Sequence, residues 1–295
     1  MSIVALYPGQ DLLIYQNNLD YKYEQYPEEN EEGKRSPADK NMPYEDITVT
    51  TEDGVKLAGW FIRDPAKSKI HPTIIHMQEN YGNIGYRLSW AENLYHNLAV
   101  NIVIVGYRGY GHSEGTPSEQ GIEKDSKAII AWTLNNDEID QNQVYVFGNV
   151  LGGAVAVYGG SFYQDKLKGL ILQNTFLNMA NAIDDTNWLF RLLRPLVLAN
   201  YWPTDERIAN TTLPILFISG TNTKTNDDMH DLFDKAVDSS YKKFLEVQGA
   251  DKSNTWRVGG QSYIKAIFDF ISYTKTLIYI PIETDGDIDI SISSA

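Results

Sequence analysis

Short apolar runs alternate with longer mixed segments along the middle of the chain. Residues 102–105 (IVIV) and 170–172 (LIL) are continuous apolar runs, which are typical of strands buried on both faces of a parallel sheet. The segments between such runs carry apolar residues at helical spacing. The pattern therefore predicts a parallel sheet covered by helices on both faces. Strands are expected at 73–77, 101–105, 144–147, 169–173, 215–219 and 243–247, and helices at 86–98, 119–134, from 151, at 227–237 and at 261–274.

Both ends of the chain differ from this pattern. Residues 24–40 are acidic and rich in turn formers, and they lack the apolar residues needed to fold alone. Two strand-like runs follow, 47–51 and 55–62, and the Asp53-Gly54 turn between them predicts an antiparallel hairpin. The last residues, 280–295, alternate apolar and acidic side chains, as in a tail or an added edge strand.

These features divide the chain into three parts. We expect an N-terminal arm and acidic linker over residues 1–44 and a C-terminal tail over residues 277–295. Between them, residues 45–276 are expected to form one domain with a helical cap insertion at about 176–202. The arm and the tail are polar enough that their order would require something to hold them in place.

Composition narrows the classes of partner. Lys+Arg 25 against Asp+Glu 39 gives a formal net charge of −14, which repels phosphate backbones and anionic lipid head groups. Nucleic acid is therefore not expected as a partner. The absence of cysteine excludes disulfides, a thiolate nucleophile and thiolate metal ligands. The most apolar stretches, 188–202 and 264–282, are interrupted by charged residues, so no membrane span is expected.

Two glycine-rich segments carry a resemblance to a known family. They are YRGYGHSEG at 107–115 and FGNVLGGA at 147–154, the second at the end of an expected strand. The sequence resembles the α/β-hydrolases, in particular the membrane-anchored α/β-hydrolase-domain proteins, serine hydrolases whose nucleophile elbow reads G-x-S-L-G-G. Residues 82–85 (GNIG) and 174–176 (NTF) match the same family. The resemblance covers about residues 11–272 and implies a mostly parallel sheet flanked by helices, an antiparallel N-terminal hairpin and a short helical cap.

The resemblance also implies three catalytic positions, and none holds its usual residue. Val150 stands where the family has its nucleophilic serine. Thr223 stands at the position of the acid in the G-x-x-D segment, and Lys252 stands at the position of the histidine. No histidine follows His230. Because valine cannot form an acyl-enzyme, we expect the triad to be degenerate.

The oxyanion loop differs from the family as well. Where the family has H-G-N, this chain has Gln78-Glu79-Asn80. The hole itself consists of backbone N–H groups, so its geometry can survive the change. A Glu79 carboxylate at the place where negative charge develops would oppose the transition state, so this loop is expected to be degenerate too.

The elbow predicts a strained backbone. A nucleophile elbow holds its central residue at positive φ, a region that is costly for a β-branched side chain. Gly148, Gly152 and Gly153 remain where the strand and helix pack closely. We therefore expect Val150 to keep positive φ, with its methyl groups filling the former site.

The other ionisable side chains offer little for a relocated site. We interpret His71, His76, His96, His112 and His230 as surface or core residues, although His76 and His112 lie nearest the carboxyl edge of the sheet, where a rebuilt acid–base site would sit. Asp227 and Asp228 are typical of the acidic first turn of a helix, so no metal or other cofactor is expected. Arg108 is interpreted as structural, bonding exposed carbonyls.

Together these features favour a catalytically inactive pseudoenzyme that serves as a structural or adaptor subunit of a larger protein assembly. The arm and the tail are the expected contacts to protein partners. Two alternatives remain: a protein that binds an apolar small molecule in the former substrate pocket without cleaving it, and a weak serine-type hydrolase with relocated residues.

The expected cellular location of the protein is inferred from the first residues of the chain. It has no basic or apolar leader and begins almost where the family follows its membrane anchor, so we expect neither secretion nor the anchor. An intracellular location is expected, cytoplasmic and in a cytoskeletal or ciliary structure, or alternatively in a mitochondrial complex.

Overall fold

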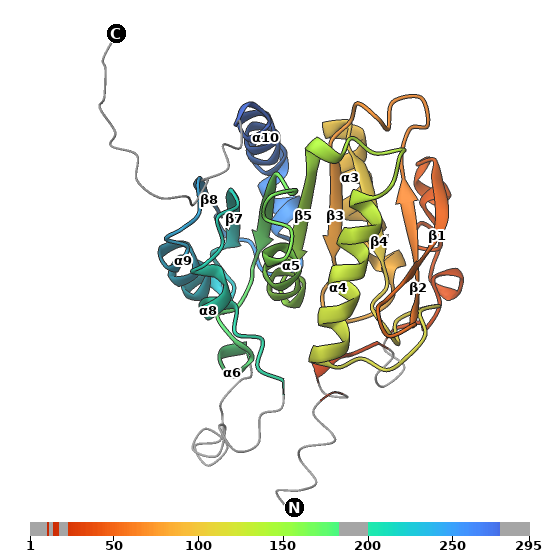
Figure 1. Ribbon diagram of the computed structural model, residues 1–295, viewed down its shortest axis with the longest axis horizontal. Helices are drawn as coiled ribbons and strands as arrows, with labels where there is room; N and C mark the ends of the chain where they lie inside the picture. Colours follow the sequence, from red (N-terminus) through yellow and green to blue (C-terminus); the bar gives the residue numbers. More distant parts are fainter. Residues whose placement is uncertain (1–10, 12–13, 18–22, 183–199, 278–295) are drawn as a thin grey trace, which may run out of the picture.

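An eight-stranded sheet forms the centre of the protein (Figure 1). The computed structural model describes residues 11, 14–17, 23–182 and 200–277. Strand order is β1-β2-β4-β3-β5-β6-β7-β8; β2 pairs antiparallel with both β1 and β4, and every other pairing is parallel. The strands are β1 Tyr44–Thr50, β2 Lys56–Ile62, β3 Thr73–Met77, β4 Asn101–Val105, β5 Val144–Asn149, β6 Gly169–Gln173, β7 Ile215–Gly220 and β8 Lys242–Val247. The predicted hairpin and parallel sheet are confirmed.

Helices cover both faces of the sheet. Those of the described residues are α3 Leu88–Leu98, α4 Glu119–Leu134, α5 Leu151–Ser161, α6 Met179–Ala182, α8 Thr204–Ile208, α9 Asn226–Lys235 and α10 Thr255–Thr276, with short 3-10 turns η2 Pro27–Glu29, η3 Pro37–Lys40, η4 Ile84–Arg87 and η5 Gln141–Gln143. The helices α4, α5, α8 and α9 share one apolar cluster, and α3 and α10 share the other. Alternate residues of β5 feed the two clusters, because successive side chains of a strand point to opposite faces. The structure is therefore the expected α/β-hydrolase fold.

The last helix begins earlier than predicted. α10 starts at Thr255 rather than at residue 261, and Gly260 lies within it at φ 46° and ψ −124°. The chain passes through the Gly259-Gly260 pair as a kink between two helical segments.

The acidic arm is held by the body of its own chain. It contains the 3-10 turns η2 and η3 and no longer element. Asn30 and Asn83 are both 1% exposed, and their side-chain amides exchange two hydrogen bonds of 2.9 and 3.0 Å. Gly85 lies beneath this contact, where a Cβ would fall 2.0 Å from the carbonyl oxygen of Lys34. Contacts within the chain therefore account for the order of this polar segment.

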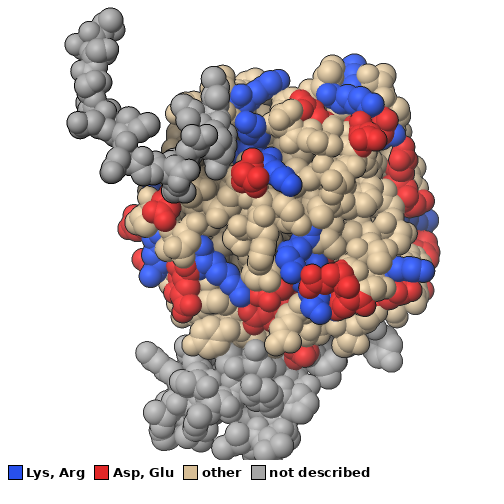
Figure 2. Space-filling view, in the orientation of Figure 1, with Lys and Arg blue, Asp and Glu red and all other residues tan. Residues whose placement is uncertain are grey.

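Two predicted features lie wholly or partly outside the described residues. These are the centre of the cap insertion, at 183–199, and the tail beyond residue 277. Within the described ranges, no helix combines the length and the apolar character needed to cross a membrane. Figure 2 shows acidic and basic side chains interspersed over one face of the molecule, with uncharged areas between them.

Candidate functional site

The elbow lies between β5 and α5, and Val150 is its central residue (Figure 1). Val150 has φ 53° and ψ −112°, which confirms the predicted positive φ. Its N–H donates to the carbonyl of Gln173 at 2.9 Å, and its carbonyl accepts from the N–H of Gly153 at 3.1 Å. The side chain is half-buried and packs against the apolar cluster of α4 and α5. The turn thus keeps the geometry that exposes a nucleophile, with an aliphatic side chain in its place.

Close packing enforces this turn. A Cβ on Gly148 would lie 2.2 Å from the carbonyl oxygen of Gly152, and a Cβ on Gly152 would lie 1.9 Å from that of Met77. A Cβ on Gly153 would lie 1.8 Å from Oγ1 of Thr175. Only glycine fits at these three positions, so β5 and α5 cannot separate to relax Val150 without losing their contacts with β3 and the loop after β6.

The positions predicted for the acid and the histidine lie in two adjacent loops. Asn222 donates its N–H to the carbonyl of Ala250 at 2.9 Å, which joins the loop after β7 to the loop after β8. Thr223 is half-buried, and its hydroxyl donates to the carbonyl of Gly220 at 3.0 Å, within its own turn. Lys252 is exposed. The fold therefore places these positions at the carboxyl edge of the sheet, but their side chains supply neither a carboxylate nor an imidazole.

Asn174 is a positioning residue of this edge that the sequence analysis did not single out. Its backbone has φ 48°, and its side chain is fully buried. The side-chain oxygen accepts from the N–H of Gly220 at 3.0 Å, and the side-chain nitrogen donates to the hydroxyl of Thr255 at 2.9 Å. One amide thereby ties the end of β7 to the start of α10. The NTF match to the family was the available signal.

The oxyanion loop carries a buried ion pair. Glu79 and Arg87 lie 2.8 Å apart, with side chains 8% and 5% exposed. The other Glu79 oxygen accepts from the side chain of Asn149 at 2.5 Å. Burial lowers the pKa of Arg87, but the Glu79 carboxylate, Tyr81 and Tyr23 together more than offset this, so the pKa of Arg87 is raised. The sequence analysis did not foresee that Glu79 is paired with Arg87, and the effect of Glu79 on a transition state stays a prediction.

Beside this pair, polar side chains are buried without full hydrogen bonding. Gln78 is 0% exposed, and neither polar atom of its side chain has a hydrogen-bond partner among the described residues. Gln173 donates to the side chain of Asn149 at 3.2 Å, while its own side-chain oxygen has no partner within the same ranges. Buried polar groups of this kind usually bind water or a ligand.

The two histidines nearest the carboxyl edge do not form an acid–base site with Val150. His76 is 3% exposed, and the centroid of its ring lies 4.5 Å from that of Trp90 and 5.3 Å from that of Phe147. Burial, with the nearby charge of Arg87, lowers the pKa of His76 to about 3. His112 instead contacts the arm, where its Nε2 lies 3.0 Å from a Glu28 carboxylate oxygen.

The other candidate groups have structural partners. His230 lies 2.9 Å from Glu246, and both side chains are exposed. Asp227 and Asp228 occupy the first turn of α9, as predicted. Across the described ranges, no group of three or more His, Asp or Glu side chains is placed to hold a metal ion.

Arg108 is structural, but its partners are carboxylates rather than the expected carbonyls. Its Nε donates to Asp125 at 2.9 Å and its guanidinium to Asp53 at 3.0 Å. Asp125 belongs to α4, and Asp53 lies in the turn of the β1–β2 hairpin. Arg108 thus joins the hairpin to the body of the fold.

An N-terminal segment contacts both the oxyanion loop and the end of the cap insertion. The N–H of Gln16 donates to the carbonyl of Asn80 at 2.7 Å, in the oxyanion loop. The hydroxyl of Tyr15 donates to the side chain of Asn200 at 2.7 Å and accepts from the indole of Trp202 at 3.1 Å. Tyr15 and Trp202 are 1% and 0% exposed and belong to the apolar cluster that Val150 contacts. Residues 15–16 therefore link the oxyanion loop to the end of the cap insertion.

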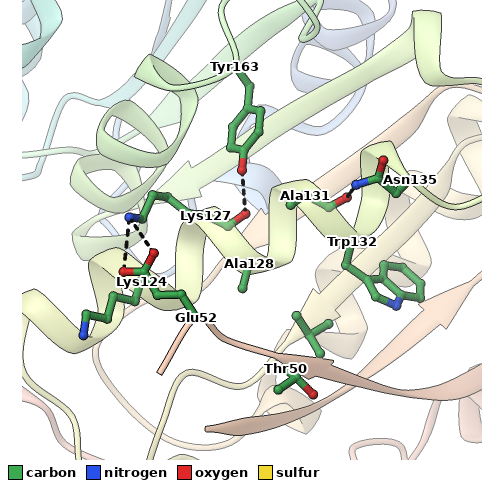
Figure 3. Close-up of a pocket in the computed structure, with 10 residues that line it drawn as sticks. Thr50, Glu52, Lys124, Lys127, Ala128, Ala131, Trp132, Asn135 and Tyr163 are labelled. Atoms are coloured by element: carbon green, nitrogen blue, oxygen red, sulfur yellow. Dashed lines mark hydrogen bonds and ion pairs between the residues drawn. The ribbon is translucent and has the colours of Figure 1, made fainter. Parts of the chain in front are cut away.

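A separate groove lies over α4. It has a volume of about 420 Å³ and is lined by α4, the β1–β2 hairpin and Tyr163 (Figure 3). Its lining includes no residue of the elbow or of the loops after β3, β7 and β8.

Similarity to known proteins agrees with the geometry. A family profile described as "alpha/beta hydrolase fold" matches residues 80–200. The chain is 34% identical over 284 residues to "Alpha/beta hydrolase domain-containing protein WAV2" of Arabidopsis thaliana, covering 91% of this chain and 89% of that protein. It is 30% identical over 264 residues to "Protein bem46" of Schizosaccharomyces pombe, covering 88% and 87%. It is 29% identical over 284 residues to "Uncharacterized membrane protein YNL320W" of Saccharomyces cerevisiae, covering 92% of each.

Solved structures share the fold at lower identity. The esterase Pf2001 of Pyrococcus furiosus has a TM-score of 0.66 and 20% identity, over 81% of this chain and 93% of that one. An alpha-beta hydrolase from Vibrio vulnificus has a TM-score of 0.68 and 18% identity, over 88% and 93%. Together with the relatives at 30% identity or more, these findings show that the chain belongs to the α/β-hydrolase family.

Proposed function

We propose that this protein is a catalytically inactive α/β-hydrolase that acts as a structural or adaptor subunit of a larger protein assembly. The observation that carries the proposal is the elbow, where packing holds Val150 in the conformation of a nucleophile although its side chain has no reactive atom. Thr223 and Lys252 complete the argument, because neither can act as the acid or the base of a serine triad.

The remaining groups do not rebuild the chemistry. His76 is a core residue whose lowered pKa keeps it neutral at physiological pH. Loss of a nucleophile lowers turnover by roughly 10⁶-fold in a serine hydrolase, so little activity is expected here. In this proposal the domain serves as a rigid body, and partner proteins contact its outer surface.

The test is labelling and turnover of the purified full chain. We expect no labelling by a fluorophosphonate probe and no hydrolysis of a simple ester above buffer. Val150→Ser alone should stay inactive, since nothing deprotonates the new hydroxyl. The triple variant Val150→Ser, Thr223→Asp, Lys252→His is the matched control, because it restores all three groups on the same backbone. Wild-type ester turnover that survives purification to homogeneity would refute the proposal.

A partner role for the two ends is part of the same proposal. The acidic side chains of Glu24, Glu31 and Glu32 are exposed on the arm. Deleting the tail, or reversing the charge of these three residues, should weaken recovery of the native assembly while leaving the far-UV circular dichroism spectrum unchanged. Unchanged recovery in both cases would place the interface on the body of the fold. An intracellular site for the assembly remains a prediction from the sequence.

Ligand binding without cleavage is the second candidate. It is favoured by the unpartnered side-chain atoms of Gln78 and Gln173 at the carboxyl edge. Native mass spectrometry of the protein purified under mild conditions would show a bound small molecule, and Gln78→Leu should abolish it. Recovery of the ligand-free mass alone would exclude this role for the protein as purified.

A further inference from the structure

A second pocket lies between the acidic arm and the β1–β2 hairpin, and it has a volume of about 240 Å³. The hairpin contributes Asp46, Thr48, Ala58 and Trp60 to its lining. These residues share one face of the hairpin, because residues that are paired across antiparallel strands lie on the same face. The hairpin thus presents one carboxylate beside an indole ring and two small side chains.

The other walls of this pocket come from segments distant in sequence. Pro27 belongs to η2 of the arm, Ile84 to η4, and Tyr110 and His112 to the glycine-rich loop after β4. The first three of these side chains are buried, and they are largely apolar. Pockets for drug-sized ligands have volumes of about 300–1,000 Å³. The smaller volume here restricts a ligand to a single ring or a short alkyl chain.

Asp46 supplies a charge that no cationic side chain offsets within the part of the chain that the structure describes. Its side chain is exposed, and its Oδ1 accepts from the indole N–H of Trp60 at 3.1 Å. No ion pair joins it to a lysine, arginine or histidine of the described ranges. Because a neutral N–H leaves the carboxylate charge in place, the pocket has a free partner for a cation.

A second carboxylate lies next to the pocket. The Nε2 of His112 is 3.0 Å from a carboxylate oxygen of Glu28, and the rings of His112 and Tyr26 are stacked with centroids 4.7 Å apart. Protonation of His112 would offset the charge of Glu28 but not that of Asp46. The site therefore stays negative with either form of His112, and it is complementary to a cationic ligand.

An organic cation matches this lining better than a metal ion. Over the described ranges, no three His, Asp or Glu side chains are grouped so that they could hold a metal. Calcium and magnesium require several oxygen ligands, whereas an ammonium group needs one carboxylate. An apolar body attached to that ammonium would also be removed from water by the walls of the pocket.

We propose that this pocket binds an organic ammonium ion with a small apolar body, which pairs with Asp46 and packs against Trp60 and Ile84. The lining includes no residue of the elbow or of the oxyanion loop, so the inference is independent of the catalytic state of the protein. The same ammonium group occurs on free amines and on the lysine side chains of polypeptides.

A chemical-shift titration of the full chain by nuclear magnetic resonance tests the site. Benzylamine should shift the amide signals of Thr48, Gly59 and Gly111, which line the pocket, saturably and with a Kd on the order of 1 mM. Benzyl alcohol is the neutral probe of the same size, and it should bind about fivefold more weakly because it lacks the ion pair. Equal binding of the two probes, or shifts centred on other residues, would overturn the proposal.

Variants test the role of the carboxylate. Asp46→Asn removes the charge but keeps an oxygen for the Trp60 N–H, so it should raise the Kd of benzylamine about fivefold and leave that of benzyl alcohol unchanged. Asp137→Asn is the matched control, because it removes the same charge at an exposed position outside the pocket. An equal loss of affinity in this control would mean a general attraction to an acidic protein and would refute the proposal.

A further variant tests the pocket itself, and a further probe identifies the source of the ammonium. Thr48→Phe should abolish binding of both probes by filling the pocket, and unchanged binding would refute the assignment. Tighter binding of benzylamine than of N-acetyl-lysine N-methylamide would assign a free amine as the ligand, and the reverse order would assign a lysine side chain. Binding of neither compound to the wild type well above the expected Kd would refute the proposal.

Discussion

Replacing Val150 with glycine isolates the backbone strain at the elbow. Valine at φ 53° is in a region that a β-branched residue rarely adopts, whereas glycine adopts it freely. The neighbouring glycines prevent the turn from relaxing, so the strain is released by changing residue 150 itself. We expect Val150→Gly to leave the stability of the protein almost unchanged.

Three contributions give that expectation. Relief of the strained conformation stabilises the variant by about 1–3 kcal/mol. Loss of a half-buried valine side chain destabilises it by about 1 kcal/mol, roughly half of the value for full burial. The extra freedom of glycine in the unfolded chain destabilises it by a further ~0.5–1 kcal/mol. The net change therefore lies between about 1.5 kcal/mol of stabilisation and about 1 kcal/mol of destabilisation.

Val55→Gly is the matched control for this prediction. Val55 is also half-buried against the same apolar cluster, but it is not among the residues with positive φ. It has no strain to lose, so we expect a loss of about 2 kcal/mol. Equilibrium unfolding in urea measures both variants under the same conditions. The reasoning fails if Val150→Gly loses as much stability as Val55→Gly, because Val150 would then be an ordinary packing residue.

Three further predictions concern other buried groups. The folded-state pKa of His76 is about 3, which is below its unfolded value of about 6.5. The contribution of neutral His76 to stability is therefore complete above pH ~6.5. It is lost as the pH falls from there toward 3, by about 1.4 kcal/mol per pH unit. His76→Phe should flatten the dependence of the unfolding free energy on pH between these values, and an unchanged slope would contradict this. Glu79→Gln should lower the free energy of unfolding by about 3–5 kcal/mol, because it leaves the buried Arg87 cation without a counter-ion. Adding Arg87→Gln to the same chain should recover part of that loss in urea unfolding. No recovery in the double variant would argue against the ion pair. Asn30→Ala should cost about 1–3 kcal/mol by removing the two amide hydrogen bonds with Asn83 and the bond to the carbonyl of Lys34. Hydrogen exchange should speed up over residues 24–40 but not in β3, and equal protection of residues 24–40 in the wild type and the variant would contradict this.

Local patterns account for the parts of the fold that the sequence predicted well. The bounds of β3, β4, β6 and α4 agree with prediction. Buried parallel strands are continuous apolar runs, and α4 begins after Ser118, whose hydroxyl caps the helix by accepting from Gly121. The elbow was predictable for a similar reason, since three glycines close to Val150 in sequence determine its conformation.

Contacts between distant residues account for most of what was missed. The reciprocal amide pair of Asn30 and Asn83 joins residues 53 positions apart, so composition alone did not show what holds the arm. Arg87 lies eight positions after Glu79, across a 3-10 turn whose path no periodic pattern reveals. The start of α10 depends on Thr255, which donates to the carbonyl of Asp251 at 2.7 Å and accepts from Asn174. Such pairings become visible only when the strands are in register.

The contacts made by residues 15–16 have a mechanical consequence. A pull on the N-terminus loads the bond from Gln16 to Asn80 and the contacts of Tyr15 with Asn200 and Trp202 before it reaches any strand of the sheet. These few bonds are weaker than the ladder that joins the eight strands, so they yield first. Tension from an attachment point would therefore open the region between the oxyanion loop and the cap before it reaches the sheet.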